Sequence, residues 1–111
     1  MTAGDVVLTP VPQADGTIKN RPAVFLREML PFNDLLVCGI STQLRQEVEG
    51  FDELISSGDA DFTSSGLVRE SLIRLGFLAV VPQSRVAGKI GSISSERHKR
   101  LLEKLSAYLV K

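Results

Sequence analysis

Cysteine and histidine are almost absent from this chain of 111 residues, which contains only Cys38 and His98. A single cysteine cannot form an internal disulfide, and Cys38 lies in an apolar run that is more typical of a buried structural thiol than of a catalytic one. No set of cysteines and histidines has the spacing of metal ligands. We therefore expect neither a metal nor another cofactor.

Neither positive nor negative charge is in excess, because 13 lysines and arginines balance 13 aspartates and glutamates. This balance excludes a polybasic protein that wraps nucleic acid, so any nucleic-acid site must be local. No apolar run reaches the roughly 18 residues of a membrane-spanning helix, and no segment resembles a signal peptide. We expect a cytoplasmic protein with no membrane partner.

Aromatic residues are also scarce, with five phenylalanines, one tyrosine and no tryptophan, and we expect most of them in the core. The hydrophobic fraction of 43% and the charged fraction of 23% are those of an ordinary globular protein. A chain of this length can bury a core without metals or disulfides. We expect residues 1–111 to form a single domain.

The stretch Asn-Arg-Pro-Ala-Val-Phe-Leu at residues 20–26 places an arginine beside an apolar run. Pro22 lacks an N–H and suits the first residue of a strand better than its middle. The residue before a proline favours extended geometry, so Arg21 should open a strand over residues 21–29. A cation held there is well placed to bind phosphate; a solvated arginine or half of a weak ion pair is the alternative.

Other short runs rich in apolar or β-branched residues predict further strands. Pro10 and Pro12 should stop the first strand, and Gly76 marks a bulge or bend. A turn-rich loop is expected over 13–20 and a short helical turn over 42–50, ended by Gly50. The predicted strands cover residues 5–9, 21–29, 35–40, 52–56, 71–75, 77–81 and 86–90.

The last part of the chain predicts a helix. Ser94 is a good N-cap, and Glu96 suits the first turn. Three leucines at i, i+4 and i+8 form one apolar stripe, and the basic residues are expected on the solvated face, with RNA contact as the less favoured alternative. The leucines are Leu101, Leu105 and Leu109, the basic residues are Arg97, Lys99, Arg100 and Lys104, and His98 is expected at the surface. Five to seven short strands followed by a helix indicate a mainly β fold, a small barrel.

Four pieces of sequence, in order along nearly the whole chain, resemble the MazF/PemK (Kid) toxins of bacterial toxin–antitoxin systems. They are Gly-Asp-Val-Val-Leu at 4–8, Asn-Arg-Pro-Ala-Val-Phe-Leu at 20–26, Gly-Ile-Ser-Thr-Gln at 39–43, and the late stretch from 71–75 to Lys-Ile-Gly-Ser-Ile-Ser at 89–94. The resemblance implies an SH3-like barrel of the CcdB/MazF type and a homodimer.

The resemblance also implies an activity. Most members of the family are sequence-specific endoribonucleases that cut single-stranded RNA without a metal and leave a 2′,3′-cyclic phosphate and a 5′-hydroxyl. A cognate antitoxin inhibits them by laying a disordered tail over the dimer groove, and DNA is contacted only indirectly through that antitoxin. The family's catalytic arginine falls on Arg21, and its catalytic threonine or serine falls on Ser41.

The chain departs from the family in two places. Its loop 13–20 lacks the Gly-x-Glu-Gln element of the best-studied members. Some members use an arginine and an aspartate two residues apart on a late strand, and here Arg74 is followed by Gly76 in the second position. An alternative function is therefore a non-catalytic binding protein on the same barrel, either a CcdB-like gyrase poison or a degenerate member that binds RNA or an antitoxin.

The residues support cleavage by electrostatic stabilisation. Arg21 can hold a phosphate through its fork of donors, and Ser41 can donate a hydrogen bond to a phosphate oxygen. Neither is an obvious base, and the proton transfers stay open between Arg21 and water. For RNA binding we name Lys19, Asn20, Thr42, Gln43 and Arg74. Gln43 can read exposed base edges, while for Arg74 an inward ion pair with a carboxylate is the alternative.

Overall fold

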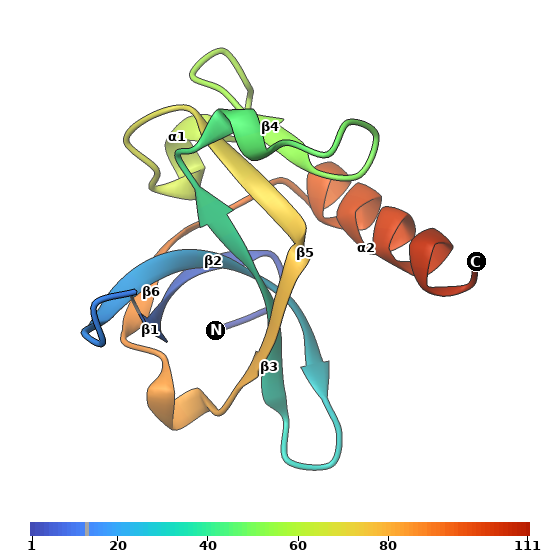
Figure 1. Ribbon diagram of the computed structural model, residues 1–111. Coiled ribbons are helices and arrows are strands. Elements are labelled where there is room, and N and C mark those ends of the chain that lie inside the picture. The colour runs from blue at the N-terminus through green and yellow to red at the C-terminus, as the bar shows by residue number, and fades with distance from the viewer. Residues whose placement is uncertain (13) are drawn as a thin grey trace.

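The computed structural model describes residues 1–12 and 14–111, so the first residue of the loop expected over 13–20 lies outside the described part. The described residues form six strands, two α-helices and two 3-10 turns (Figure 1). The strands are β1 (Asp5–Pro12), β2 (Ile18–Met29), β3 (Asp34–Ser41), β4 (Glu53–Ile55), β5 (Ser71–Val81) and β6 (Gly88–Ser92). The helices are α1 (Phe62–Ser65) and α2 (Ser95–Leu109), and the 3-10 turns are η1 (Leu44–Gln46) and η2 (Gln83–Arg85).

The strands form one antiparallel sheet in the order β4-β5-β3-β2-β1-β6. Figure 1 shows this sheet curled into a half-barrel, with α2 lying along one side of it. The predicted mainly β fold with a C-terminal helix is confirmed, and so is the short helical turn after the third strand.

A bulge in β5 contributes to the curl. Gly39 of β3 pairs with Arg74, but its neighbour Cys38 pairs with Leu78, so three residues of β5 have no counterpart on β3. Gly76 is the middle one of these three, where the sequence predicts a bend. A bulge bends and twists its strand, and β5 accordingly continues over residues 77–81 beyond the bend, as predicted.

Two prolines lie inside strands, contrary to expectation. β1 continues through Pro10 and ends at Pro12, and Pro22 is the fifth residue of β2, not its first. The pairing of β1 with β6 ends at Leu8, and that of β2 with β3 ends at Ala23. Each proline therefore lies where its strand has a partner on one side only, and such an edge tolerates a missing N–H.

The core has two parts, one on each face of the sheet. Alternate residues of a strand point to opposite faces, and accordingly Val6, Val24 and Cys38 pack with α2, whereas Val7 and Val37 pack in a second cluster. Both clusters consist of fully or nearly fully buried side chains. This two-sided burial explains why β1, β2 and β3 are apolar in unbroken runs.

The C-terminal part of α2 and half of the aromatic rings lie outside the core. Leu109 is 67% exposed, although the predicted stripe includes it, because the end of α2 extends beyond the sheet (Figure 1). Phe25 is the only phenylalanine in the described core. Phe51 and Phe62 are partly buried and pack against that core, whereas Phe32, Phe77 and Tyr108 are exposed, so the expectation that most aromatic residues lie in the core holds for only half of them.

The first turn of α2 corrects another expectation. Ser94 caps the helix as predicted, because its Oγ accepts a hydrogen bond from the Arg97 N–H at 3.1 Å. Arg97 itself, however, is only 6% exposed and is not part of a solvated face. Its guanidinium donates to Asp61 at 2.8 Å, to Asp59 at 2.9 Å and to Glu53 at 3.0 Å. These carboxylates come from a segment distant in sequence that wraps around the start of α2.

His98 and the other cations of α2 complete this arrangement. The Nε2 atom of the half-buried His98 lies 2.8 Å from the carbonyl oxygen of Leu26, so His98 is not the simple surface residue expected. Arg100 and Lys104 each lie 3.1 Å from a carboxylate oxygen of Glu53. We call Glu53, Asp59, Asp61, Arg97, Arg100 and Lys104 the α2 ion cluster.

The electrostatics of the α2 ion cluster favour its charged form. Burial raises the pKa of Asp61, but hydrogen bonds from Arg97 and from the Ser94 N–H outweigh this effect and leave the pKa below its ordinary value. Burial acts in the same direction on the pKa of Glu53, and hydrogen bonds from Arg100 and Lys104 again bring about a net lowering. The cluster thus holds the segment containing β4 and α1 against the helix.

Gly66 allows that segment to approach β6 closely. It follows α1 with a φ of 77°, a left-handed conformation that favours glycine. A Cβ atom at this position would collide with the carbonyl oxygen of Ile90. The absence of a side chain therefore lets the chain turn tightly and places residues 67–69 beside the sheet.

Candidate functional site: an arginine-lined groove

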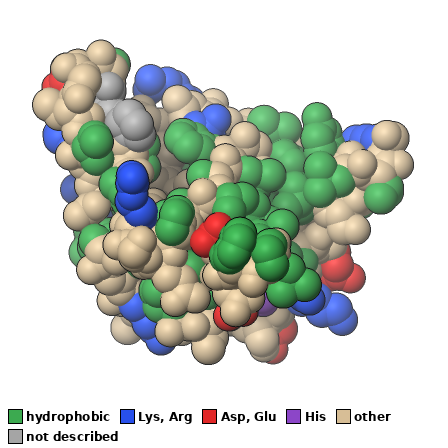
Figure 2. Space-filling view, turned by 90° about the horizontal axis from the view of Figure 1, so that it is seen from below, with side chains coloured by type: hydrophobic (Ala, Val, Ile, Leu, Met, Phe, Trp, Pro, Cys, Tyr) green, Lys and Arg blue, Asp and Glu red, His purple; other side chains and the backbone are tan. Residues whose placement is uncertain are grey.

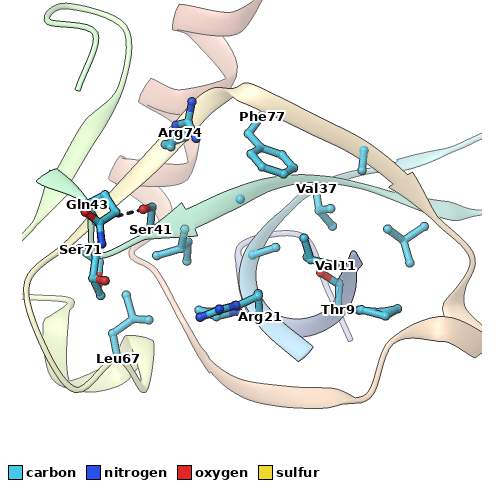
Figure 3. Close-up of a pocket in the computed structure, with 18 of the residues that line it drawn as sticks. Thr9, Val11, Arg21, Val37, Ser41, Gln43, Leu67, Ser71, Arg74 and Phe77 are labelled. Carbon is cyan, nitrogen blue, oxygen red and sulfur yellow. Dashed lines mark hydrogen bonds between the residues drawn. The ribbon is translucent and has the colours of Figure 1, made fainter. Parts of the chain in front are cut away.

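A groove of about 740 Å³ lies across the sheet, with β3 as its floor. Figure 3 shows Thr9, Val11 and Arg21 of β1 and β2 below β3, and Arg74 and Phe77 of β5 above it. We call it the β3 groove. The described residues that line it are Thr9, Pro10, Val11, Ala14, Arg21, Pro22, Ala23, Val37, Gly39, Ile40, Ser41, Thr42, Gln43, Leu67, Val68, Arg69, Ser71, Arg74, Phe77, Ala79 and Val81.

The two residues predicted to be catalytic both line the β3 groove. Arg21 is exposed on β2, opposite Thr9 of β1, and Ser41 is the last residue of β3. The Oγ atom of Ser41 accepts a hydrogen bond from the Gln43 N–H at 3.0 Å (Figure 3). This bond orients the hydroxyl and leaves its hydrogen available for donation to a ligand.

Of the five residues predicted to bind RNA, the structure brings three into the β3 groove. Thr42, Gln43 and Arg74 line it, whereas Lys19 and Asn20 are not among its described lining residues. Lys19 and Asn20 were expected in a loop but belong to β2, where they are exposed. They extend the same strand beyond Arg21, toward the end of the β1–β2 hairpin.

Sequence analysis missed two notable lining residues, Arg69 and Phe77. The guanidinium carbon of Arg74 lies 5.7 Å from the centroid of the Phe77 ring, within the range of a cation–π contact. No carboxylate among residues 1–12 and 14–111 is within ion-pair distance of Arg74, so the ion pair considered for it is not formed in the described structure. Arg69 and Phe77 each lie two residues from the segment 71–75, and no local sequence pattern indicates that either lines a groove.

The charge of the β3 groove is positive. Arg21, Arg69 and Arg74 line it, and its described lining includes no aspartate, glutamate or histidine. Guanidinium groups present several donors in a planar fork that matches the oxygens of phosphates and carboxylates. The remaining lining is mostly apolar or uncharged, so the groove suits an anionic ligand that also carries flat or apolar groups.

Two other features of the chain limit its chemistry. Cys38 is fully buried, and burial raises the pKa of its thiol to about 12, so it is a structural residue as expected. Within the described ranges, no three or more His, Cys, Asp or Glu side chains are grouped to hold a metal ion.

The helices that the structure describes are too short or too polar to cross a membrane.

Comparison with known proteins identifies the family. The sequence matches the PemK-like, MazF-like toxins of type II toxin–antitoxin systems over residues 2–109, almost its whole length. The chain belongs to this family. The resemblance noted in the sequence is thereby confirmed, and the protein is a type II toxin. A toxin of this type has an antitoxin as its partner.

A solved structure supports the same fold. The Mycobacterium tuberculosis toxin MazF-mt6 superimposes on this toxin with a TM-score of 0.65, covering 95% of each chain at 17% sequence identity. At this identity the likeness establishes the fold and not the activity. A sequence comparison with curated proteins found no match.

Proposed function

We propose that this toxin is a metal-independent endoribonuclease that cuts single-stranded messenger RNA in the β3 groove. The observation that carries the proposal is the presence of Arg21 and Ser41, from two neighbouring strands, in the lining of one cavity. Both fall where the family has its catalytic residues. The positive charge of the groove is the charge that an RNA backbone requires.

In the proposed reaction the 2′-oxygen of one nucleotide attacks the adjacent phosphorus. A P–O bond to the 2′-oxygen forms, the bond to the 5′-oxygen breaks, and the products end in a 2′,3′-cyclic phosphate and a 5′-hydroxyl. The 2′-hydroxyl loses a proton, and the departing 5′-oxygen gains one. Arg21 binds the phosphate and stabilises the negative charge that builds up on it, and Ser41 donates a hydrogen bond to one of its oxygens.

The other residues of the groove would position the RNA. Arg69 and Arg74 can contact neighbouring phosphates, and Thr42 and Gln43 can contact bases at the end of β3. Lys19 and Asn20, outside the groove, would meet RNA that extends along β2. Sequence preference would then depend on Gln43 and on the loops that border the groove.

We also propose a homodimer, with the antitoxin tail lying over the groove and DNA contacted only through the antitoxin. Figure 2 shows hydrophobic side chains gathered over a broad part of one face. Exposed large hydrophobic residues at the end of β2, in the β2–β3 turn and on β5 provide apolar surface that a second copy could bury. They are Met29, Leu30, Phe32, Leu78 and Val80.

The test is to incubate the purified protein with a diverse pool of single-stranded RNA in EDTA and to map the product ends. Arg21→Ala is the main variant, and Arg27→Ala is its matched control, because Arg27 is exposed on the same strand but does not line the groove. We expect the parent and Arg27→Ala to leave cyclic phosphate ends. Arg21→Ala should cut about 10²- to 10³-fold more slowly, as when one donor to a transition-state oxyanion is removed.

Two results would overturn the proposal. A folded Arg21→Ala protein that cuts as fast as the parent would remove Arg21 from the mechanism. A parent that leaves the whole pool intact would remove the ribonuclease activity itself.

A second candidate function is a toxin that binds its target without cutting it. The observation that favours it is the lack of an acidic or histidine side chain in the described lining of the groove, since these are the usual general bases. A growth test that reads both RNA integrity and DNA breaks separates the two candidates. Intact RNA with broken DNA would indicate a gyrase poison.

A further inference from the structure

We propose that Phe77, held by Arg74, is a stacking platform for a nucleobase in the β3 groove and contributes to base preference. This inference rests on the proposed RNA-cleaving function. It assigns a second role to the groove: β2 and the end of β3 bind the phosphate, and β5 binds a base.

The bulge in β5 determines where Phe77 points. Phe77 is the last of the three residues without a counterpart on β3, directly before the Leu78–Cys38 pair. From there its ring lines the groove, as do Ala79 and Val81 farther along, while the intervening Leu78 and Val80 do not. Phe77 is thus separated from the apolar residues that β5 presents on its other face.

Gly39 makes room for the ring. A Cβ atom at this position would lie 3.4 Å from the Cγ atom of Phe77, at the short end of ordinary van der Waals contact. The phenylalanine therefore packs over bare backbone on the floor of the groove.

The guanidinium of Arg74 lies over the ring of Phe77. Its guanidinium carbon lies 5.7 Å from the ring centroid, and a cation at this distance is attracted to the aromatic face. Even so, Phe77 keeps 46% of its surface exposed. An ordered, half-exposed aromatic ring beside a guanidinium is the combination on which unpaired RNA bases stack.

The position relative to Arg21 fits a nucleotide. Figure 3 shows Arg74 and Phe77 on one side of β3, Arg21 on the other, and Ser41 at the end of the strand. A phosphate bound at Arg21 and Ser41 would leave a neighbouring base free to reach the opposite wall. A purely apolar protein segment would make no use of the three arginines that line the same groove.

The experiment measures binding without cleavage. The probe is a short, random-sequence 2′-O-methyl RNA, which lacks the attacking hydroxyl, and the comparison probe has the same backbone without bases. Phe77→Leu keeps an apolar side chain over Gly39 but removes the aromatic face, and Phe77→Trp retains a face. Tyr108→Leu is the matched control, because Tyr108 is 55% exposed, lies at the end of α2 and does not line the groove.

We expect Phe77→Leu to weaken binding of the base-bearing probe at least about 5-fold, the lower end of what a base–aromatic stack provides. Binding of the abasic probe should not change, and Phe77→Trp and Tyr108→Leu should bind as the parent does. Equal affinity of parent and Phe77→Leu for the base-bearing probe would overturn the inference. An equal loss of affinity for both probes in Phe77→Leu would also overturn the inference. A change in self-association of this variant without any change in RNA binding would do the same.

Failure of this inference differs from failure of the ribonuclease. A parent that cuts natural RNA while Phe77→Leu binds normally refutes only the stacking role. A parent that binds the probe through Phe77 but cuts no natural RNA refutes only the ribonuclease. A parent that binds neither probe refutes the stacking role directly.

Discussion

Two groups of basic side chains in this toxin have opposite surroundings. In the α2 ion cluster, Arg97, Arg100 and Lys104 all lie on carboxylates, and Arg97 is buried among three of them. The arginines of the β3 groove instead line a cavity whose described lining includes no carboxylate, and Arg74 contacts an aromatic ring. The same residue type thus joins distant segments in one region and lines an open groove in the other.

The two groups of basic side chains differ in the residues that surround them, not in the basic residues themselves. A buried guanidinium is tolerated only when carboxylates and hydrogen bonds replace its water. An arginine that lines an open groove stays hydrated and can give up that water to a ligand. We therefore expect substitutions in the α2 ion cluster to change stability, and substitutions in the groove to change activity.

The largest effect on stability is expected for Arg97→Leu. This change leaves the buried Asp61 without its guanidinium partner and removes one of the three cations at Glu53, and breaking a buried ion pair in this way typically costs about 3–5 kcal/mol. The free energy of unfolding, from urea titration, measures the loss. The groove variant Arg21→Ala should stay within about 0.5 kcal/mol of the parent. Similar losses in both variants would erase the distinction between the two regions.

A hydroxyl in the groove provides the next test. Ser41→Ala removes the proposed donor to the phosphate, and a hydrogen bond to a charged group is worth about 1.5–3 kcal/mol. We expect RNA cleavage to slow roughly 10- to 100-fold, whereas Ser41→Thr, which keeps the hydroxyl, should stay close to the parent. Equal rates for the parent and the alanine variant would show that Ser41 only shapes the turn at Gln43.

Acid should destabilise the fold through the α2 ion cluster. The pKa values of Asp61 and Glu53 are lowered in the folded protein, so these groups stabilise the fold above their ordinary values of roughly 4. That contribution is lost as the pH falls through the lowered values. Unfolding free energies between neutral and acidic pH should show this decline, and a shallower one for Asp61→Asn. An unchanged slope in that variant would contradict the assignment.

The smallest effect is expected at the outer edge of the cluster. Lys104 is 30% exposed at its side chain and shares Glu53 with Arg97 and Arg100. A partly solvated ion pair contributes about 0–1 kcal/mol, so Lys104→Ala should lower the free energy of unfolding by no more than that. A loss as large as that of Arg97→Leu would mean that solvent screening is weaker here than the exposure indicates.

Much of the fold could be predicted because its signals are local. The β-branched runs, the bend at Gly76 and the cap at Ser94 each depend on a few neighbouring residues, and the structure confirms them. The family motifs also led to Arg21 and Ser41, which line the groove together. Their catalytic role stays a prediction until cleavage is measured.

The sequence by itself determined the strand content, the helix with its cap and the family, since periodicity, capping and motifs are properties of neighbouring residues. Only the tertiary structure decided that Arg97 is surrounded by carboxylates, that prolines fit where β1 and β2 have a strand on one side only, and that Phe77 lines the groove. Arg97 is buried because Glu53 and Asp61, more than thirty residues away, close over it. Such outcomes depend on which segments meet in space, and no local pattern around Arg97 or Phe77 encodes the partner.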